Sequence, residues 1–216
     1  KPGPVPIAAR PAQPTTGAGA DAAVKTAQAC TTLEELKTAL EQFDGGLLKR
    51  SAKNTVFADG IAGAPLMVVG DLPGGDEDQQ GRPFVGPAGQ LLDRMLAAIE
   101  CSRADNVYLT DFVPWRPLGN SKPGADILAM CKPFVERHIA LAKPKIVVLL
   151  GGIPARALLN TEDSISRQRG KWKKLSAYGS NFDVIPMVHP SYLLSQPLQK
   201  KAAWQDLLSI KERLLS

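Results

Sequence analysis

The chain has 216 residues, of which 44% are hydrophobic and 22% are charged. This composition supports one globular domain with a substantial core and excludes collagen-like and acidic disordered chains. No apolar run approaches the roughly 20 residues that a membrane helix needs, so a transmembrane protein is excluded as well. No charged head leads into an apolar signal core near Lys1, and the sequence does not predict secretion.

The net charge of +5 is distributed unevenly. Residues 1–100 hold 9 Lys and Arg against 12 Asp and Glu, a net of −3, whereas residues 101–216 hold 17 against 9, a net of +8. The basic half is the candidate for facing phosphates, although solvated helix faces would carry the same excess of lysine. Charge alone does not distinguish a phosphate-binding surface from solvated helix faces.

The three cysteines, Cys30, Cys101 and Cys131, are widely separated and form no Cys-x-x-Cys pair. Neither a disulfide scaffold nor a zinc site built from these thiols alone is expected. Reduced thiols in a cytoplasmic protein are the simplest interpretation.

The beginning of the chain is crowded with Pro, Ala, Gly and Thr, and residues 1–28 show no sustained apolar period. This composition predicts a disordered arm, followed by one domain over residues 29–216. The first predicted helix follows Thr32, because Glu35 stands three residues later in the spacing of a capping box. Apolar residues continue at helical spacing to Phe43, and the glycine pair that follows should end the helix.

Beyond this helix, apolar runs and helical spacings alternate along the chain. The runs predict strands at residues 65–69, 106–113, 145–150 and 183–188. The spacings predict helices at residues 91–99 and 127–138, another that starts at 155, and a last one at 204–214. Strands that alternate with helices need crossover connections, so we expect a mostly parallel sheet covered by helices on both faces.

In such sheets, ligands bind beyond the carboxyl ends of the strands. Four loops lie there: residues 70–75, 111–116, 151–152 and 189–194. Asp71 directly follows the first strand, where a carboxylate can be held with room for a water, although a cap or turn role is the commoner alternative. His189 follows the last strand, whereas His138 falls on a helix face and is interpreted as structural.

Residues 70–90 are polar and rich in glycine, yet they enclose an isolated aromatic residue, Phe84. The phosphate-binding patterns GxxxxGK(S/T) and GxGxxG are both absent. Loops of this kind often build a site, although Phe84 could instead plug the core.

Four segments together resemble the uracil-DNA glycosylase superfamily, most closely the bacterial branch known as family 4. They are GDLPGGDEDQQGRPFVGPAGQLLDRML, VYLTDFVPWRP, PKIVVLLGG and HPSYLL, and the resemblance runs from about Thr55 to Leu208. It implies an α/β fold, a three-layer αβα sandwich with a central four-stranded parallel sheet. It also implies hydrolysis of the bond between uracil and deoxyribose, which leaves an abasic site for base excision repair. No lysine is placed like a Schiff-base nucleophile, so we expect no strand cleavage by the protein itself.

The resemblance implies a partner and a place as well. The partner is DNA that contains uracil, single- or double-stranded, and no membrane. The protein is expected to act as a monomer in the cytoplasm, at the bacterial nucleoid.

Roles follow from the matching motif positions. Asp71 stands where the family usually has glutamate, and it would position water or offset the positive charge on the sugar. Phe84 would stack on the flipped base, and His189 would donate to uracil O2 as negative charge develops there. Gly70 and Leu72, in the motif of Asp71, would also contact the base.

Two groups of residues are assigned to the DNA. The residues after His189 resemble a loop that enters the minor groove, where Tyr192 or Leu193 would fill the space left by the flipped base. A basic run in the second half would follow the phosphates, with a solvated hairpin face as the alternative. The DNA contacts expected are Arg116, Arg169, Lys171, Lys173, Ser191, Tyr192 and Leu193.

Members of the family that carry an iron-sulfur cluster hold it with four cysteines, and three of those positions differ here. The early pair falls around Phe43 and Gly46, the third position is Trp115, and only Cys131 matches. One thiolate cannot hold a cluster. The sequence therefore predicts a protein without a metal or other cofactor, in which Trp115 and packing fix the loop.

A further departure is Asp111, where the family usually has asparagine. An asparagine amide can accept from uracil N3–H and donate to O4, whereas an ionised aspartate can only accept. Recognition through Asp111 requires a protonated carboxyl group, a shifted pose or backbone donors. We therefore expect weakened activity or an altered base preference.

Two other functions stay open. A protein of the same fold could bind uracil or abasic sites and turn over poorly, since Asp71 is one methylene shorter than glutamate. A small-molecule hydrolase on a doubly wound sheet is disfavoured, because the chain has no GxSxG elbow and no metal-ligand pair.

Overall fold

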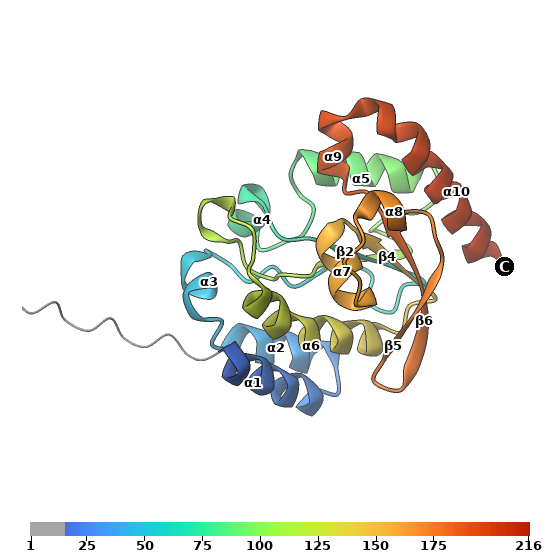
Figure 1. Ribbon diagram of the computed structural model, residues 1–216. Coiled ribbons are helices and arrows are strands. Elements are labelled where there is room, and N and C mark those ends of the chain that lie inside the picture. The colour runs from blue at the N-terminus through green and yellow to red at the C-terminus, as the bar shows by residue number, and fades with distance from the viewer. Residues whose placement is uncertain (1–15) are drawn as a thin grey trace, which may run out of the picture.

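The computed structural model describes residues 16–216, in which a mixed six-stranded sheet lies between two layers of helices (Figure 1). The strands are β1 (Asp59–Gly60), β2 (Leu66–Gly70), β3 (Val107–Asp111), β4 (Ile146–Leu150), β5 (Lys173–Ala177) and β6 (Ser180–Met187). They lie in the order β1-β3-β2-β4-β6-β5. Neighbours among the four central strands are parallel, and β1 and β5 pair antiparallel at the two edges.

The four parallel strands confirm the sheet expected from the sequence, and the two edge strands are additions to it. Strand β1 is only two residues long, and β5 buries only alternate residues, Leu175 and Ala177, between exposed polar ones. A tight turn joins β5 to β6, with both Tyr178 and Gly179 at positive φ. Such short, half-polar segments give little apolar signal in a sequence.

The helices are α1 (Thr16–Ala29), α2 (Leu33–Gln42), α3 (Gly46–Ser51), α4 (Gly75–Gln80), α5 (Pro87–Ala97), α6 (Ala125–Ala142), α7 (Gly152–Leu159), α8 (Ile165–Gln168), α9 (Pro190–Ser195) and α10 (Lys200–Leu215). Two 3₁₀ turns, η1 (Leu118–Asn120) and η2 (Pro197–Gln199), complete the set. Within residues 16–216, none of the helices combines the length and apolar character needed to span a bilayer.

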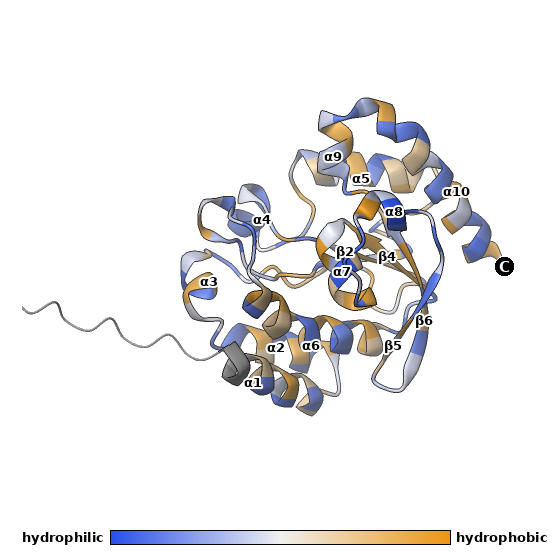
Figure 2. Cartoon of the chain, viewed as in Figure 1, coloured by the Kyte–Doolittle hydropathy of each residue, from blue (hydrophilic) through white to orange (hydrophobic). Residues whose placement is uncertain are grey.

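The central strands are buried on both faces, and alternate residues enter two separate cores. In β4, Val147 and Leu149 join the core beneath α1, α2, α6 and α7. Ile146, Val148 and Leu150 join the core beneath α5, α9 and α10. Figure 2 shows the hydrophobic colouring of the central strands between these layers. Burial on both faces explains why these strands appear in the sequence as continuous apolar runs.

Helix α1 corrects the expectation of a disordered arm over residues 1–28. From Thr16 onward the chain is helical, and Ala23 and Ala27 are fully buried against α6. The small side chains let the two helices approach closely, and they carry too little apolar signal to be recognised as a helix face in the sequence. Residues 1–15, where the rest of the expected arm falls, lie outside the described residues.

Thr32 caps the start of α2 as expected, but the second bond of the capping box goes to the residue before the cap, Thr31. Thr32 Oγ1 accepts a hydrogen bond from the backbone N–H of Glu35 at 3.1 Å, and the Glu35 carboxylate accepts from the N–H of Thr31 at 2.6 Å. In contrast, residues 70–90 are not one continuous loop, because α4 begins at Gly75 inside this segment.

Candidate active site

The residues expected to act on a substrate gather at one edge of the sheet, where the parallel strands end. Gly70 and Asp111 are paired neighbours at the ends of β2 and β3. Asp71 follows β2, and His189 follows β6 and precedes α9. The topology therefore brings together segments more than 100 residues apart, as the carboxyl-edge rule requires.

The carboxylate of Asp71 lies at the beginning of α7. Its Oδ1 accepts a hydrogen bond from the backbone N–H of Ile153 at 2.9 Å. Burial raises the pKa of Asp71 to about 6, against the opposing effect of the Ile153 N–H, the Arg156 charge and the Gly152 N–H. The group is thus ionised at neutral pH and titrates close to it.

Gly151 makes this position of Asp71 possible. Its φ is 121°, and a Cβ there would lie 2.3 Å from Asp71 Oδ1. Any side chain at residue 151 would both strain the backbone and displace the carboxylate.

Gly70 forms the floor between Asp111 and Phe84. A Cβ at Gly70 would lie 2.3 Å from Asp111 Oδ1 and 2.5 Å from the Phe84 ring. Both side chains are buried, and they therefore line a space that only glycine leaves open. Leu72, the other residue expected to contact the base, is half-buried and packs against the core beneath α6 and α7.

Asp111 is a buried carboxyl group in a negative environment. Burial raises its pKa well above the usual range, and the charges of Glu77 and Asp71 raise it further. The raised pKa favours the neutral acid, which has one O–H donor and one carbonyl acceptor. The direction of this shift is the one that recognition of uracil through a protonated Asp111 requires.

The imidazole of His189 has a defined tautomer. Its Nδ1 accepts a hydrogen bond from the backbone N–H of Ser191 at 3.2 Å and lies 2.7 Å from the Ser191 hydroxyl. The neutral ring must therefore carry its proton on Nε2. Burial lowers the pKa of His189 to about 4, although the charge of Glu77 opposes this. Its ring stacks near Phe84, with centroids 5.9 Å apart.

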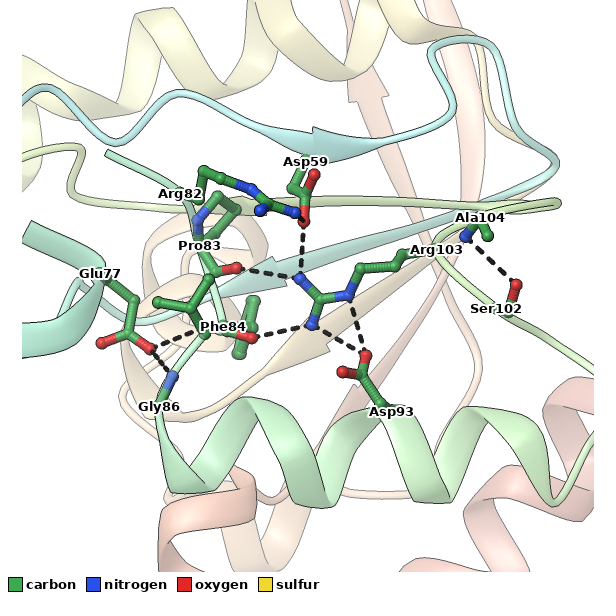
Figure 3. Close-up of polar contacts among 11 residues, drawn as sticks. Asp59, Glu77, Arg82, Pro83, Phe84, Gly86, Asp93, Ser102, Arg103 and Ala104 are labelled. Atoms are coloured by element: carbon green, nitrogen blue, oxygen red, sulfur yellow. Dashed lines mark hydrogen bonds and ion pairs between the residues drawn. The ribbon is translucent and has the colours of Figure 1, made fainter. Parts of the chain in front are cut away.

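Two charged residues that the sequence did not single out hold the loop of Phe84 in place (Figure 3). The Glu77 carboxylate accepts hydrogen bonds from the backbone N–H groups of Gly74, Val85 and Gly86, at 3.1, 3.0 and 2.8 Å. Glu77 lies inside the glycine-rich segment that the sequence singled out, but nothing in that pattern indicated that it holds the loop of Phe84.

Arg103 holds the same loop from the other side. Its guanidinium donates to the carbonyls of Phe84 at 2.8 Å and Pro83 at 3.3 Å, and it pairs with Asp59 and Asp93 (Figure 3). These contacts stabilise Phe84 at a φ of 54°, which is unfavourable for a residue with a side chain. No motif surrounds Arg103, and only the fold places it beside the loop.

The DNA contacts expected after His189 are partly wrong. Leu193 is 1% exposed and packs in the core beneath α9, so it is not free to enter a groove. Tyr192 is 44% exposed, Leu194 is equally exposed, and Ser191 is also at the surface. In a short helix only one face can point outward, and Leu193 lies on the inner one.

Arg169 is also misplaced among the expected phosphate contacts. It pairs with the buried carboxylate of Asp206 on α10 at 2.7 Å and donates to the carbonyl of Ala202. Lys171 is exposed and Lys173 half-exposed. Gly170 bonds to the carbonyl of Pro186 on β6, which places Lys171 close to the carboxyl edge.

Arg116, the remaining basic residue of the set, lies over the glycines that start α4. A Cβ on Gly75 would be 3.4 Å from its guanidinium. Its Nε donates to the side chain of Asn120 at 3.0 Å. It is half-exposed and stands beside the loop that follows Asp71.

The residues at the family's cluster positions do not fit an iron-sulfur cluster. Trp115 is almost fully buried, and its indole N–H donates to Thr55 at 2.8 Å. Phe43 packs edge-on against Phe134 with ring centroids 5.1 Å apart. Burial raises the pKa of Cys131 to about 12, so its thiol stays protonated. Aromatic packing and one neutral thiol cannot supply the thiolates that iron requires.

Metal ligation by other side chains is not supported either. Across residues 16–216, no three His, Cys, Asp or Glu side chains are grouped so that they could hold a metal ion. His138 is buried, stacks on Phe57 and lies 3.0 Å from the Tyr108 hydroxyl, which agrees with a structural role.

Comparison with known proteins agrees with this arrangement. Residues 57–208 match the family model described as the uracil DNA glycosylase superfamily. A type-4 uracil-DNA glycosylase of Saccharolobus solfataricus is 35% identical over 168 residues, which cover 76% of this chain and 78% of the relative. One of Archaeoglobus fulgidus is 34% identical over 169 residues, covering 76% and 84%. One of Thermotoga maritima is 36% identical over 142 residues, covering 65% and 72%.

Proposed function

Because the chain belongs to the uracil-DNA glycosylase superfamily, in its type-4 branch, we propose that it hydrolyses the bond between uracil and deoxyribose in DNA. The observation that carries the proposal is the meeting of Asp71, Phe84, Asp111 and His189 around Gly70 at one edge of the sheet. A base in a duplex cannot reach such an edge unless it leaves the stack.

The two candidate catalytic groups have complementary charge states. Cleavage leaves positive charge on the sugar and negative charge on uracil. Asp71, ionised at neutral pH, offsets the first and orients the water that attacks C1′. His189 donates Nε2–H toward uracil O2 while remaining neutral, so it stabilises the developing anion as a fixed donor.

Substrate recognition falls to Phe84, Asp111, Gly70 and Leu72. Phe84 offers a ring for stacking, held rigidly by Glu77 and Arg103. In its neutral form, which the raised pKa favours, the carboxyl group of Asp111 accepts from uracil N3–H and donates to O4, as an asparagine amide would. Gly70 leaves room for the base to reach both.

The DNA duplex or single strand would lie across the carboxyl edge. The exposed Ser191 and Tyr192 on α9 would face the minor groove of the DNA. Arg116, Lys171 and Lys173 would lie toward its phosphates. The protein would act as a monomer that leaves an abasic site for later repair enzymes. Since its substrate is chromosomal DNA, its expected place is the nucleoid in the cytoplasm.

An alkali assay tests the reaction. The protein is incubated with labelled single- and double-stranded oligonucleotides that contain one uracil, and the products are treated with hot alkali. We expect alkali-dependent cleavage that is lost in Asp71→Ala and His189→Ala, and none on a matched thymine oligonucleotide. Absence of both cleavage and binding would place the activity outside DNA.

A second function, a binder that turns over poorly, is favoured by one observation. The short side chain of Asp71 is already hydrogen-bonded to the α7 backbone, which leaves it less free to hold water. Retarded mobility of the uracil oligonucleotide without cleavage would identify this case.

The role of Asp111 is tested by Asp111→Asn. We expect the rate of uracil removal to change. The donor and acceptor atoms of an amide are fixed, whereas either oxygen of a carboxyl group can carry the proton. Equal rates for the two proteins on uracil would remove Asp111 from recognition.

A further inference from the structure

A groove with a volume of about 290 Å³ lies between α5, α9 and α10, outside the candidate active site. Its lining is Leu91, Arg94, Met95, Ala98, Leu193, Lys200, Ala203, Trp204 and Leu207. Seven of these nine residues are apolar, and α5 contacts both α9 and α10, so the groove is a hollow in a packed layer.

The surface around the groove exposes more large apolar side chains than a solvent-facing layer needs. Trp204 is 41% exposed, Leu208 45% and Leu198 93%, and Tyr192 and Leu194 are exposed as well. Apolar and polar residues alternate along α9 and α10 in this part of the molecule (Figure 2). An apolar patch beside a groove is the pattern of a protein-binding surface.

The charge of the groove is positive. Arg94 and Lys200 are its charged lining residues, and no carboxylate lines it. The carboxylates nearest along α5 and α10 are already paired: Asp93 with Arg103, Glu100 with Lys211 and Asp206 with Arg169. An occupant with negative charge beside an apolar anchor would meet complementary charges at Arg94 and Lys200.

A nucleic acid strand fits this groove poorly. Its phosphates need several N–H or ammonium donors along a track, and the floor of the groove consists of leucine, methionine and alanine side chains. A peptide fits better, because leucine or phenylalanine side chains can be buried on that floor while acidic neighbours reach Arg94 and Lys200.

We propose that this groove binds an acidic peptide segment of a partner protein, anchored by large apolar side chains against Trp204 and Leu207. Helix α9 carries Leu193 in the groove and begins directly after His189, its N-cap residue, so a bound partner would lie next to the carboxyl edge of the sheet. The groove would thereby hold the enzyme beside a protein that is itself on DNA. This function goes beyond uracil removal and does not depend on it.

The test measures peptide binding and uracil removal separately on the full chain. The probe is a fluorescein-labelled synthetic peptide with leucine and phenylalanine one helical turn apart among aspartates and glutamates. A second probe has the same apolar residues among lysines. Anisotropy is measured for the wild type and for Arg94→Glu and Trp204→Ala, and Lys25→Glu on α1 is the control with the same change of charge.

We expect saturable binding of the acidic probe that weakens at least tenfold in Arg94→Glu and in Trp204→Ala. The lysine probe should not bind, Lys25→Glu should bind like the wild type, and all variants should remove uracil from a naked oligonucleotide at the wild-type rate. Equal binding of both probes, or equal binding by all variants, would overturn the proposal. So would a loss of oligonucleotide binding in Arg94→Glu with no binding of the acidic probe, because the groove would then serve DNA.

Discussion

Three residues at the carboxyl edge have pKa values shifted from those they would have in water. Asp71 and Asp111 are carboxyl groups with raised pKa values, and His189 is an imidazole with a lowered one. Burial is the largest cause of all three shifts, and it favours the neutral form of each group. Perturbation of this kind is common at catalytic sites.

The pH dependence of uracil removal should follow Asp71. Its pKa of about 6 predicts that kcat/KM falls about tenfold per pH unit below pH 6, because the protonated acid no longer offsets the sugar cation. His189, with a pKa of about 4, stays neutral through this range. A profile from pH 4.5 to 8 checks this, and a flat profile down to pH 5 would contradict it.

The same pKa predicts a cost in stability. The pKa of an aspartate in the unfolded chain is about 4, so the folded protein binds a proton more tightly. The stability from this group is fully present below pH 4 and is lost as the pH rises through 6.

Asp71→Asn should therefore be more stable than the wild type at pH 7.5, by up to about 3 kcal/mol, and nearly inactive. The amide oxygen can still accept from Ile153, so the fold is preserved. Denaturant unfolding at pH 7.5 and pH 4 measures the difference, which should shrink at the lower pH. A variant that is less stable at both values would refute this account.

At the scale of elements, the segment between α4 and α5 depends on charges from outside it. The Glu77 carboxylate accepts hydrogen bonds from backbone N–H groups of this segment, and the Arg103 guanidinium donates to its carbonyls (Figure 3). A segment with positive φ at Phe84 would otherwise relax, and the ring would lose its place beside Gly70 and His189.

Arg103→Ala should lower kcat/KM on uracil more than tenfold, equivalent to more than about 1.4 kcal/mol of transition-state stabilisation. Arg82→Ala is the matched control, because Arg82 also pairs with Asp59, at 2.9 Å, but is more exposed and has no contact with the loop carbonyls in the described structure. Arg82→Ala should keep near wild-type activity.

A positioning role for Arg103 is distinguished by a double-mutant cycle with Phe84→Leu. If Arg103 acts through the ring, the second substitution adds little to the loss in Arg103→Ala. Fully additive losses in kcat/KM would show that Arg103 acts elsewhere.

At the scale of the whole molecule, the excess positive charge of the second half divides between structure and surface. Arg169 is paired with Asp206, whose side chain is 5% exposed, and joins the end of α8 to α10. Lys171, next to it near the carboxyl edge, is exposed and free to meet a phosphate. Net charge in the sequence counts the two alike.

The two basic residues should therefore behave differently on substitution. Lys171→Ala should reduce the salt dependence of DNA binding by about one phosphate contact and leave unfolding unchanged. Arg169→Ala should lower the free energy of unfolding by roughly 3 kcal/mol, because it leaves the Asp206 carboxylate buried without its partner. Anisotropy titrations at several salt concentrations and urea unfolding measure the two effects. The reverse pattern would contradict this assignment.

Much of the fold could be predicted because its signals are local. The buried strands are continuous apolar runs, and Thr32 with Glu35 specifies the start of α2. The carboxyl-edge rule then places Asp71 and His189 together without any knowledge of contacts. Helix α1 was not predicted, because its buried alanines pack well but give little hydrophobic signal in the sequence.

Only the tertiary structure decided the properties that depend on residues distant in the sequence. The raised pKa of Asp111 follows from burial and from the charges of Glu77 and Asp71, and the place of Phe84 follows from Arg103. The side that Leu193 faces and the partner of Arg169 also depend on packing against other elements. Residue types and their spacing in the sequence determined which groups are available at the carboxyl edge, whereas burial and pairing in three dimensions decided their charge and their freedom to act.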